Sequence, residues 1–476
     1  MPSLPQNDSR QARERRERVL AKRKLRYLLN YNHIGPVQFV PILPKGETFT
    51  IRYRLRQFLS ILRVLLNQAV VVVRHFFSPP RKLEDYRSYY PVLPLPDVAH
   101  RYKEDAEFAR QRVAGANPMV IRNVKTVDYD AAARMRLSAA QFETAVGKGK
   151  TIATETADDR LYLCDYTHLH TVVPGVWDGT QKTFATPLAL FHLEGEQRRL
   201  VPVAIQLDPA DGSGRPVYLP GEGADWLMAK MYVQMADGVD HELTTHLGRT
   251  HLVIQPFVMN TNRELPDSHP VYVLLKPHFE GTMAINQAAN PDLLAPRGPI
   301  AMVFAGTMES NLATAAEGIV EYYKRFFDFA FPRNLELRGV GDPALFPDFP
   351  HRDDGALHWA AIETYVGGYV DVYYKFDRDV ADDYELQNWI AAMRRGLDLA
   401  SGGGGVAALP KALQTRDQLK AILAQVRSRG AARMTSKVKP PPNLASTLMI
   451  LYSLPGIIFT TTEPKTSTAI YRGLMR

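Results

Sequence analysis

Three histidines recur at intervals of five residues in the segment DHELTTHLGRTH, namely His241, His246 and His251. In a regular α-helix, side chains five residues apart point in directions that differ by roughly 140°, so they do not share a face. A π-type turn with i→i+5 hydrogen bonds would bring His241 and His246 to the same side, and such turns gather at functional sites. Two neutral imidazoles on one side of a helix can hold a divalent transition metal, whereas ordinary packing is the alternative interpretation.

The residues around this pair do not match one familiar metal motif. Glu242 follows His241 directly, but zinc peptidases place their two histidines four residues apart on a regular helix. The gap of five therefore does not fit a zinc peptidase. We interpret two later histidines, His269 and His278, as structural residues whose ring nitrogens are satisfied by local partners.

The segments that must position these histidines are mostly helical in pattern. Helical periodicity dominates residues 226–287 and returns in four later stretches, 311–327, 358–374, 383–397 and 413–426. Short runs rich in β-branched residues between positions 161 and 207 predict a few strands. The sequence shows no internal repeat and no glycine-rich phosphate loop. We therefore expect a mostly helical fold with a small β-containing subregion.

Composition indicates an ordinary globular protein. The chain has 476 residues, of which 45% are hydrophobic and 23% charged, a balance typical of folded soluble domains. Its single cysteine, Cys164, rules out an intramolecular disulfide and fits a reducing compartment. The first residues lack the apolar run of a secretory signal. We expect the chain to be cytoplasmic and monomeric, with membrane association as a further interpretation.

Residues 1–90 form a basic and amphipathic N-terminal region in which we expect irregular helices. The positive charge is concentrated in residues 10–26, where nine Lys and Arg residues accompany only two acids. We interpret this segment first as a solvated helix and next as a peripheral contact with an anionic membrane, since clustered cations gain roughly 1 kcal/mol each near such lipids. Nucleic acid is not expected as a partner, because no recognition fold accompanies the cluster.

Residues 55–77 contain an apolar stretch that could be mistaken for a membrane span. Arg56, Arg63 and Arg74 interrupt it, and a charge at the centre of a bilayer costs about 2.5–3.5 kcal/mol or more. The pattern therefore predicts a buried or interfacial amphipathic helix instead of a span.

The histidine segment and its surroundings resemble the metal-binding region of lipoxygenases, the non-haem iron dioxygenases of polyunsaturated fatty acids. The matching positions keep a fixed order: Trp226, Ala229–Lys230, Asp237, His241–Leu243, His246–Leu247, Thr250–His251, Arg263, Leu265, His269–Pro270, Leu274–Leu275, Pro277–His278 and Ile285–Asn286. Residues 108–119, 165–207 and 362–389 are also similar to the family. The resemblance implies a lipoxygenase-like helical catalytic domain over residues 91–426, without the N-terminal β-sandwich, as in bacterial members.

The resemblance also implies an activity and a set of site residues. The activity is insertion of O2 into polyunsaturated fatty acids with a cis,cis-1,4-diene, which gives hydroperoxides. His241 and His246 match two ligands of the family's non-haem iron, and His251 matches a position that supports the site without binding metal. Gly341, in LELRGVGD, matches a residue that lines the oxygen pocket, where glycine accompanies R products; a simple turn before Asp342 is the alternative interpretation.

The match stops near residue 427, and residues 427–476 form a divergent tail without family similarity. The family takes its remaining iron ligands from a downstream His-x-x-x-Asn motif and a C-terminal isoleucine, but this chain has no histidine after His358. Asn443 is the only plausible oxygen donor there, and it follows Pro440–Pro442, which cannot continue a helix.

We therefore expect a C-terminal part that is truncated or altered. A reading-frame change near residue 427 would explain it, and so would a short member of the family that has lost its metal. The second interpretation of function is accordingly a catalytically inactive, lipid-binding homologue of lipoxygenases.

Overall fold

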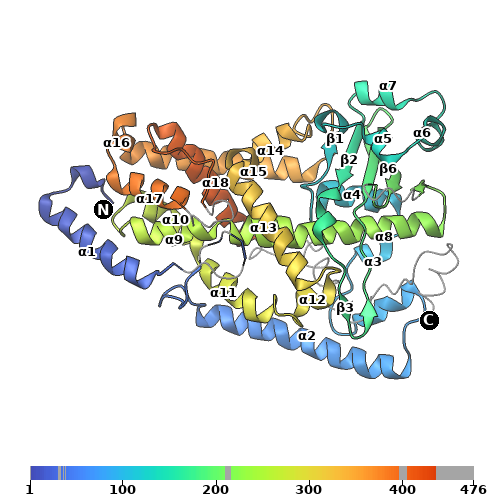
Figure 1. Cartoon of the computed structure of the whole chain (residues 1–476), viewed down its shortest axis with the longest axis horizontal. Helices are drawn as coiled ribbons and strands as arrows, with labels where there is room; N and C mark the ends of the chain where they lie inside the picture. The colour runs from blue at the N-terminus through green and yellow to red at the C-terminus, as the bar shows by residue number, and fades with distance from the viewer. Residues whose placement is uncertain are drawn as a thin grey trace.

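The computed structural model describes residues 2–29, 34–35, 37, 39–209, 216–395 and 405–435. The predicted ligand Asn443 and most of the predicted tail lie outside these residues. Within them the chain is mostly helical and has a five-stranded and a two-stranded sheet toward one end, which confirms the predicted fold class (Figure 1).

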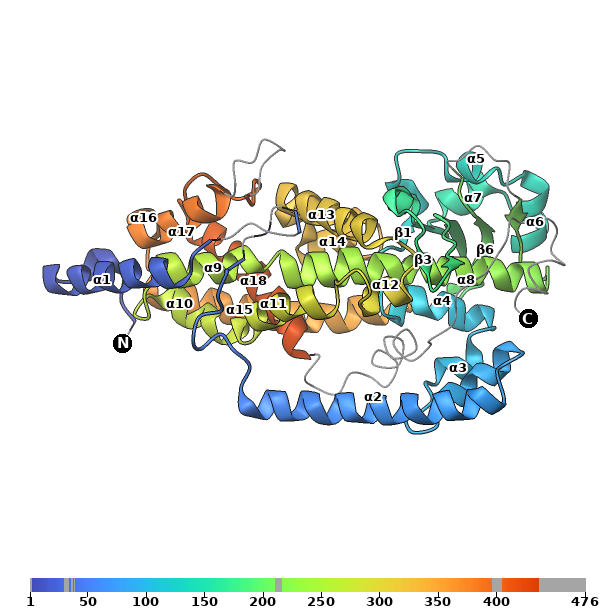
Figure 2. The same ribbon diagram turned by 60° about the horizontal axis from the view of Figure 1, so that its bottom comes forward.

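Three consecutive helical segments form a rod along the long axis of the molecule (Figures 1 and 2). They are α8 (Ala224–Val239), the π-helix η5 (Asp240–Leu252) and α9 (Gln255–Glu264). Val239 and Asp240 both keep right-handed helical dihedrals, so η5 continues α8 without a break. α9 carries a proline in its first turn, where the missing N–H has no helical partner to lose.

Helices from later in the chain cover this rod. α13 packs against η5, α17 packs against α9, and α15 packs against α18. Their bounds are Met308–Lys324 for α13, Pro350–Tyr373 for α15, Tyr384–Arg395 for α17 and Arg416–Thr435 for α18. These four helices correspond to the four later stretches of helical periodicity in the sequence.

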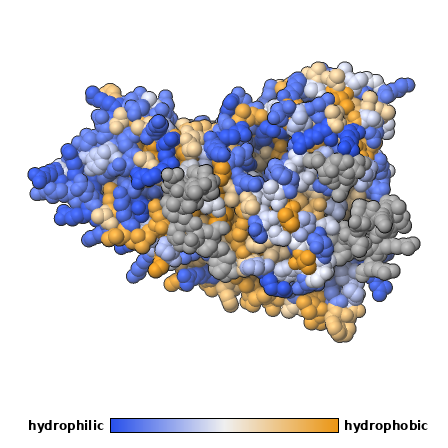
Figure 3. Space-filling view, viewed as in Figure 1, coloured by the Kyte–Doolittle hydropathy of each residue, from blue (hydrophilic) through white to orange (hydrophobic). Residues whose placement is uncertain are grey.

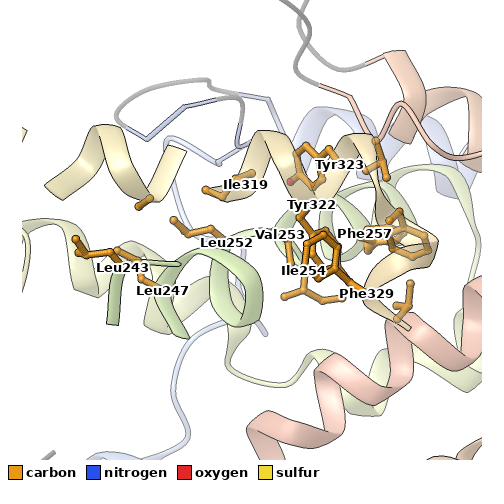
Figure 4. Close-up of a cluster of buried hydrophobic side chains, with 14 of the residues drawn as sticks. Leu243, Leu247, Leu252, Val253, Ile254, Phe257, Ile319, Tyr322, Tyr323 and Phe329 are labelled. Atoms are coloured by element: carbon orange, nitrogen blue, oxygen red, sulfur yellow. The ribbon is translucent and has the colours of Figure 1, made fainter. Parts of the chain in front are cut away.

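The apolar core between η5 and α13 holds the π-helix in place. Figure 4 shows Leu243, Leu247 and Leu252 of η5 beside Ile319 and Tyr322 of α13. Each such side chain gains about 1.5–3 kcal/mol when it is fully buried. One side of η5 is therefore fixed by packing, which leaves its other side for polar residues.

A five-stranded antiparallel sheet forms the β-containing subregion. The strands lie in the order β1-β2-β5-β6-β7, with bounds Arg122–Asn123, Leu161–Asp165, Leu188–Glu194, Arg199–Gln206 and Val217–Tyr218. β5 and β6 form a hairpin that turns at Gly195, whose positive φ of 69° favours glycine. One face is covered by α5 (Ala131–Met135) and α6 (Ala139–Val146), and α4 (Asp105–Ala114) packs on β6.

The N-terminal region contributes two long helices, α1 (Arg10–Arg26) and α2 (Ile51–Phe77), which begin at the side-chain caps Ser9 and Thr50. α2 lies along the lower edge of the molecule in Figure 2. Among the described residues, it is the one helix long and apolar enough to cross a membrane, judged by length and composition alone.

The remaining elements are short and connect these parts. They are η1 (Pro5–Asn7), η2 (Leu83–Tyr89), α3 (Val98–Arg101), η3 (Val124–Thr126), α7 (Ile152–Ala157), η4 (Thr167–Thr171), β3 (Val176–Trp177), β4 (Thr180–Gln181), α10 (Pro270–Leu275), η6 (Lys276–Phe279), α11 (Thr282–Asp292), α12 (Pro299–Val303), η7 (Phe326–Phe329), α14 (Phe331–Leu337) and α16 (Asp377–Ala381).

Candidate metal centre

The π-helix predicted from the histidine spacing is present. η5 spans Asp240–Leu252, and at its end the N–H of Val253 donates to the carbonyl of Gly248, five residues earlier, at 3.0 Å. The rings of His241 and His246 stack with centroids 5.6 Å apart and planes within 5° of parallel. The two imidazoles therefore lie side by side on one face, as expected for a π-type turn between them.

A carboxylate sets the tautomer of His246. Its Nδ1 lies 3.0 Å from Oε2 of Glu242. Burial would raise the pKa of Glu242, but the hydrogen bond and the nearby imidazoles lower it below its usual value, so the carboxylate is ionised and can only accept. His246 must then donate from Nδ1, so when the ring is neutral its lone pair is on Nε2, where it faces Nε2 of His251; a metal bound at Nε2 would replace that contact.

His241 is also in the form that a metal needs. Burial, together with the neighbouring His246, lowers the pKa of His241 to about 4. The ring is therefore neutral at pH 7, and a neutral imidazole is the metal-binding form.

The third histidine of the series contacts the second one. Nε2 of His251 lies 3.1 Å from Nε2 of His246, and the two rings meet edge to face at 4.7 Å between centroids. The backbone carbonyl of His251 accepts from Nδ2 of Asn286 on α11 at 2.9 Å, and Asn286 also donates to Gln255 at 2.8 Å. These contacts are compatible with the supporting role predicted for His251, which stays a prediction.

Polar groups next to the two histidines hold the first turn of η5. Asp240 is buried and accepts from Nε2 of His168 at 2.7 Å and from Nδ2 of Asn117 at 2.8 Å. Asn117 also accepts from the hydroxyl of Thr245 at 3.3 Å. Asp240 and Thr245 immediately precede His241 and His246. The side-chain amide of Asn117 therefore links the two positions just before the histidines.

A buried ion pair fixes the end of α8 just before this turn. Arg112 lies 3.1 Å from Asp237 and donates to the hydroxyl of Tyr166 at 2.9 Å, and Tyr166 donates to Asp237 at 2.7 Å. A buried charge pair is tolerated when further hydrogen bonds support it, and here Tyr166 and Asn117 both donate to Oδ1 of Asp237. Sequence reasoning did not assign Asn117, His168 or Arg112 to the site, because their partners lie 54 to 123 positions away along the chain.

The donor set fits part of an iron site. Two neutral imidazoles on one face are suitable nitrogen ligands for iron. Within the described ranges of the chain, no group of three or more His, Cys, Asp or Glu side chains could hold a metal ion. His241 and His246 can therefore supply two ligands, and the assignment of these two residues and of Asn443 as ligands stays a prediction.

The structure does not bring Gly341 to the histidines. Gly341 is exposed in the segment after α14, and a Cβ built there would lie 3.7 Å from atoms of Leu335 and Glu336 of α14. No contact among the described residues places Gly341 in an oxygen pocket, so this assignment stays a prediction.

The two histidines interpreted as structural have partners in space that are distant in sequence, and for His278 only Nε2 is bonded, since its Nδ1 is buried without a partner among the described residues. His269 is fully buried, with Nε2 at 3.1 Å from Asp383 and Nδ1 accepting from the N–H of Val271 at 3.1 Å. His278 accepts from Nε of Arg427 at 3.0 Å. In the described part of the chain, neither His269 nor His278 contacts the His241–His246 pair.

A helical fold built around a π-helix with paired histidines is typical of one class of protein. The lipoxygenase family profile matches residues 75–426, and the chain belongs to the lipoxygenase family. A linoleate 9/13-lipoxygenase of Pseudomonas aeruginosa is 38% identical over 375 residues, which cover 76% of this chain and 52% of that protein.

Other relatives agree with this assignment. An allene oxide synthase-lipoxygenase protein of Plexaura homomalla is 29% identical over 443 residues, which cover 86% of this chain and 40% of that protein. The chain thus spans about half the length of the curated relatives it matches. An anaerobic crystal structure of a lipoxygenase in complex with arachidonate superposes with a TM-score of 0.82 at 26% identity, over 100% of this chain and 73% of that chain.

Proposed function

We propose that this chain is an iron-dependent lipoxygenase that inserts O2 into polyunsaturated fatty acids with a 1,4-diene and forms hydroperoxides. The observation that supports this most strongly is the side-by-side placement of two imidazoles, His241 and His246, on a π-helix. The substrate class is supported by relatives, since one is named for linoleate and a structural neighbour contains arachidonate.

The residues of the chain hold and orient the donors in this proposal. Iron, when bound, supplies removal of a hydrogen atom from the bis-allylic carbon, after which O2 adds to the substrate radical. His241 and His246 would bind the ion through neutral ring nitrogens. Glu242 accepts the hydrogen bond from Nδ1 of His246. Asn117 bonds Asp240 and Thr245 and thereby supports the π-helical turn between the two histidines.

The alternative function is a catalytically inactive, lipid-binding homologue with the same scaffold. One observation favours it: the described part of the chain offers no group of three or more ligating side chains around a single point. Two neutral ligands alone bind iron weakly, because they neither complete its coordination nor compensate its charge.

Iron analysis and a product assay on the same sample separate the two functions. The purified full chain is incubated anaerobically with ferrous iron, freed of unbound metal, and analysed for iron. It is then mixed with linoleate in air while conjugated-diene absorbance is recorded. The proposal expects about one iron per chain and steady diene formation, whereas neither iron nor diene would establish the inactive alternative.

Histidine variants identify the ligands within that assay. We expect His241→Gln and His246→Gln each to lower bound iron at least about tenfold, because each removes one of few nitrogen donors. His100→Gln, a change of the same kind at an exposed position, is the matched control and should keep wild-type iron content. Equal iron content in all three variants would rule out the assigned ligands.

A further inference from the structure

The long helix α2 is amphipathic, and the side of it that contacts the protein is the polar side. Asn67, Val71 and His75 lie four residues apart and so share one face. Asn67 donates to the carbonyl of Tyr89 at 2.9 Å and accepts from the N–H groups of Val92 and Leu93 at 3.0 and 3.1 Å.

The same face makes a second contact with the segment that follows the helix. Nε2 of His75 lies 2.8 Å from the hydroxyl of Ser88, and its ring meets the ring of Tyr89 edge to face. The polar face of α2 is therefore the face that its own protein uses.

The apolar face of α2 lies about half a turn away and is exposed. At 100° per residue, Phe58, Leu62, Leu65, Val73 and Phe76 fall on the side opposite Val71. All five are exposed, Phe76 to 81%, whereas Val71 is exposed to 3%. Figure 3 shows apolar side chains gathered along the lower edge of the molecule, where α2 lies in Figure 1.

The charges of α2 indicate which kind of partner its apolar face would bind. The helix contains five arginines and no acidic residue. Four of the arginines, Arg52, Arg54, Arg63 and Arg74, are exposed. An apolar face bordered by cations is the pattern of a helix that lies in the surface of an anionic bilayer, with its apolar side chains among the lipids and its cations at the head groups.

We propose that α2 is a membrane-docking helix that lies flat in the surface of an anionic lipid bilayer. This surface differs from the basic segment 10–26 that the sequence suggested. In α1 several cations already bond within the protein: Arg16 pairs with Glu385, Arg23 donates to the carbonyl of Leu265, and Lys24 pairs with Glu264. α1 therefore contributes structural bonds, and the exposed apolar face belongs to α2.

Two other occupants are disfavoured by charge. A second copy that paired through the same face would place the arginines of one α2 against those of the other, and like charges repel. Residues 436–476 contain five Lys and Arg residues and only one Glu, so their charges do not complement the cationic border of α2; the stretch 440–462 is uncharged and is the occupant that the stability measurement below tests. An anionic bilayer alone matches both the apolar face and its cationic border.

Vesicle sedimentation with paired variants tests the proposal. The full chain is mixed with phosphatidylcholine vesicles that either contain or lack phosphatidylglycerol. We expect wild type to bind the anionic vesicles, and Leu65→Gln/Phe76→Gln to bind them at least about tenfold more weakly, because two apolar side chains no longer enter the lipid. The control, Leu357→Gln/Val372→Gln, removes two side chains of similar exposure from α15 and should bind like wild type.

A second pair of variants tests the charge. Arg63→Gln/Arg74→Gln should weaken binding to anionic vesicles about tenfold and leave binding to neutral vesicles unchanged. Glutamine keeps helix propensity in all these variants, so circular dichroism should show unchanged helix content and confirm that the chains are folded.

Four outcomes would overturn the proposal. Equal vesicle binding by the α2 and α15 variants would show that α2 does not dock. A wild-type dimer that Leu65→Gln/Phe76→Gln dissociates would assign the face to a second copy. A large fall in melting temperature of that variant, without a change in vesicle binding, would assign the face to another part of the chain. Retention of bound protein in alkaline carbonate would indicate a span. None of these readouts depends on iron or diene formation, so the proposed function is tested separately.

Discussion

At the scale of single residues, the alignment of the two histidine rings depends on a side chain that touches neither of them. Asn117 donates to Asp240 and accepts from Thr245, the residues just before His241 and His246. A regular α-helix would place these two partners on different faces, so the amide fits the π-helix and not its regular counterpart. His168 bonds the other oxygen of Asp240 and completes the support.

We expect Asn117→Ala to weaken both the fold and the metal centre. The change leaves buried Asp240 and Thr245 each without one partner, so the free energy of unfolding should fall by about 1–3 kcal/mol. Urea denaturation measures that loss, and iron content measures the effect on the centre. The control, Asn260→Ala, removes a buried amide that bonds the carbonyl of Pro256 on α9. Iron content that falls equally in both variants would contradict a specific role for Asn117.

At the scale of elements, η5 and α13 approach closely because small residues face each other. A Cβ added at Gly318 of α13 would lie 3.0 Å from Cγ2 of Thr244 of η5, which is shorter than an ordinary carbon contact of about 3.5–4.0 Å. A Cβ added at Gly248 of η5 would lie 3.5 Å from the carbonyl oxygen of Ala315 of α13. The two helices of the apolar cluster in Figure 4 can therefore approach this closely because position 318 carries no side chain.

Gly318→Leu should therefore separate the two helices. We expect the free energy of unfolding to fall by about 1–3 kcal/mol, because the added side chain has no space in a packed core. Gly368→Leu is the matched control, since Gly368 is exposed on α15 and no atom lies within 4 Å of a built Cβ. This change should not lower the free energy of unfolding. Thermal or urea denaturation gives both values, and equal stabilities would refute the tight contact.

At the scale of the whole molecule, local pattern predicted the elements, whereas their contacts required the structure. Periodicity located the later helices and the strands, and the spacing of His241 and His246 predicted the π-helix, because both are local signals. The sequence showed that α2 has an apolar face. Whether the rest of the protein covers that face depends on residues that are far away in the sequence. The support of Asp240 by Asn117 is likewise a long-range fact, which a single sequence does not encode at any fixed spacing. The exposed position of Gly341 just after α14 is a local feature, and the sequence already offered a turn there.

A long-range bond between the N-terminal helix α1 and α17 carries the last prediction. Buried Arg16 of α1 donates to Glu385 of α17 at 2.7 Å and to Asp8 at 2.6 Å. Burial raises the pKa of Glu385 to about 7 even though Arg16 opposes the shift. Arg16→Ala removes that opposition, so the folded-state pKa rises further above the unfolded value of about 4.3, and ionisation at higher pH then costs stability.

We therefore expect Arg16→Ala to destabilise the chain more at pH 8 than at pH 6, by about 3 kcal/mol at the higher pH, where an ionised Glu385 would be buried without its cation. At pH 6 the carboxyl takes up a proton in the folded state and avoids most of that cost. The control is Arg15→Ala on the exposed side of the same helix, which should change stability by less than about 0.5 kcal/mol. Urea denaturation at both pH values measures these differences; a loss that does not depend on pH would show that Arg16 acts by packing alone and that α1 is not joined to α17 through charge.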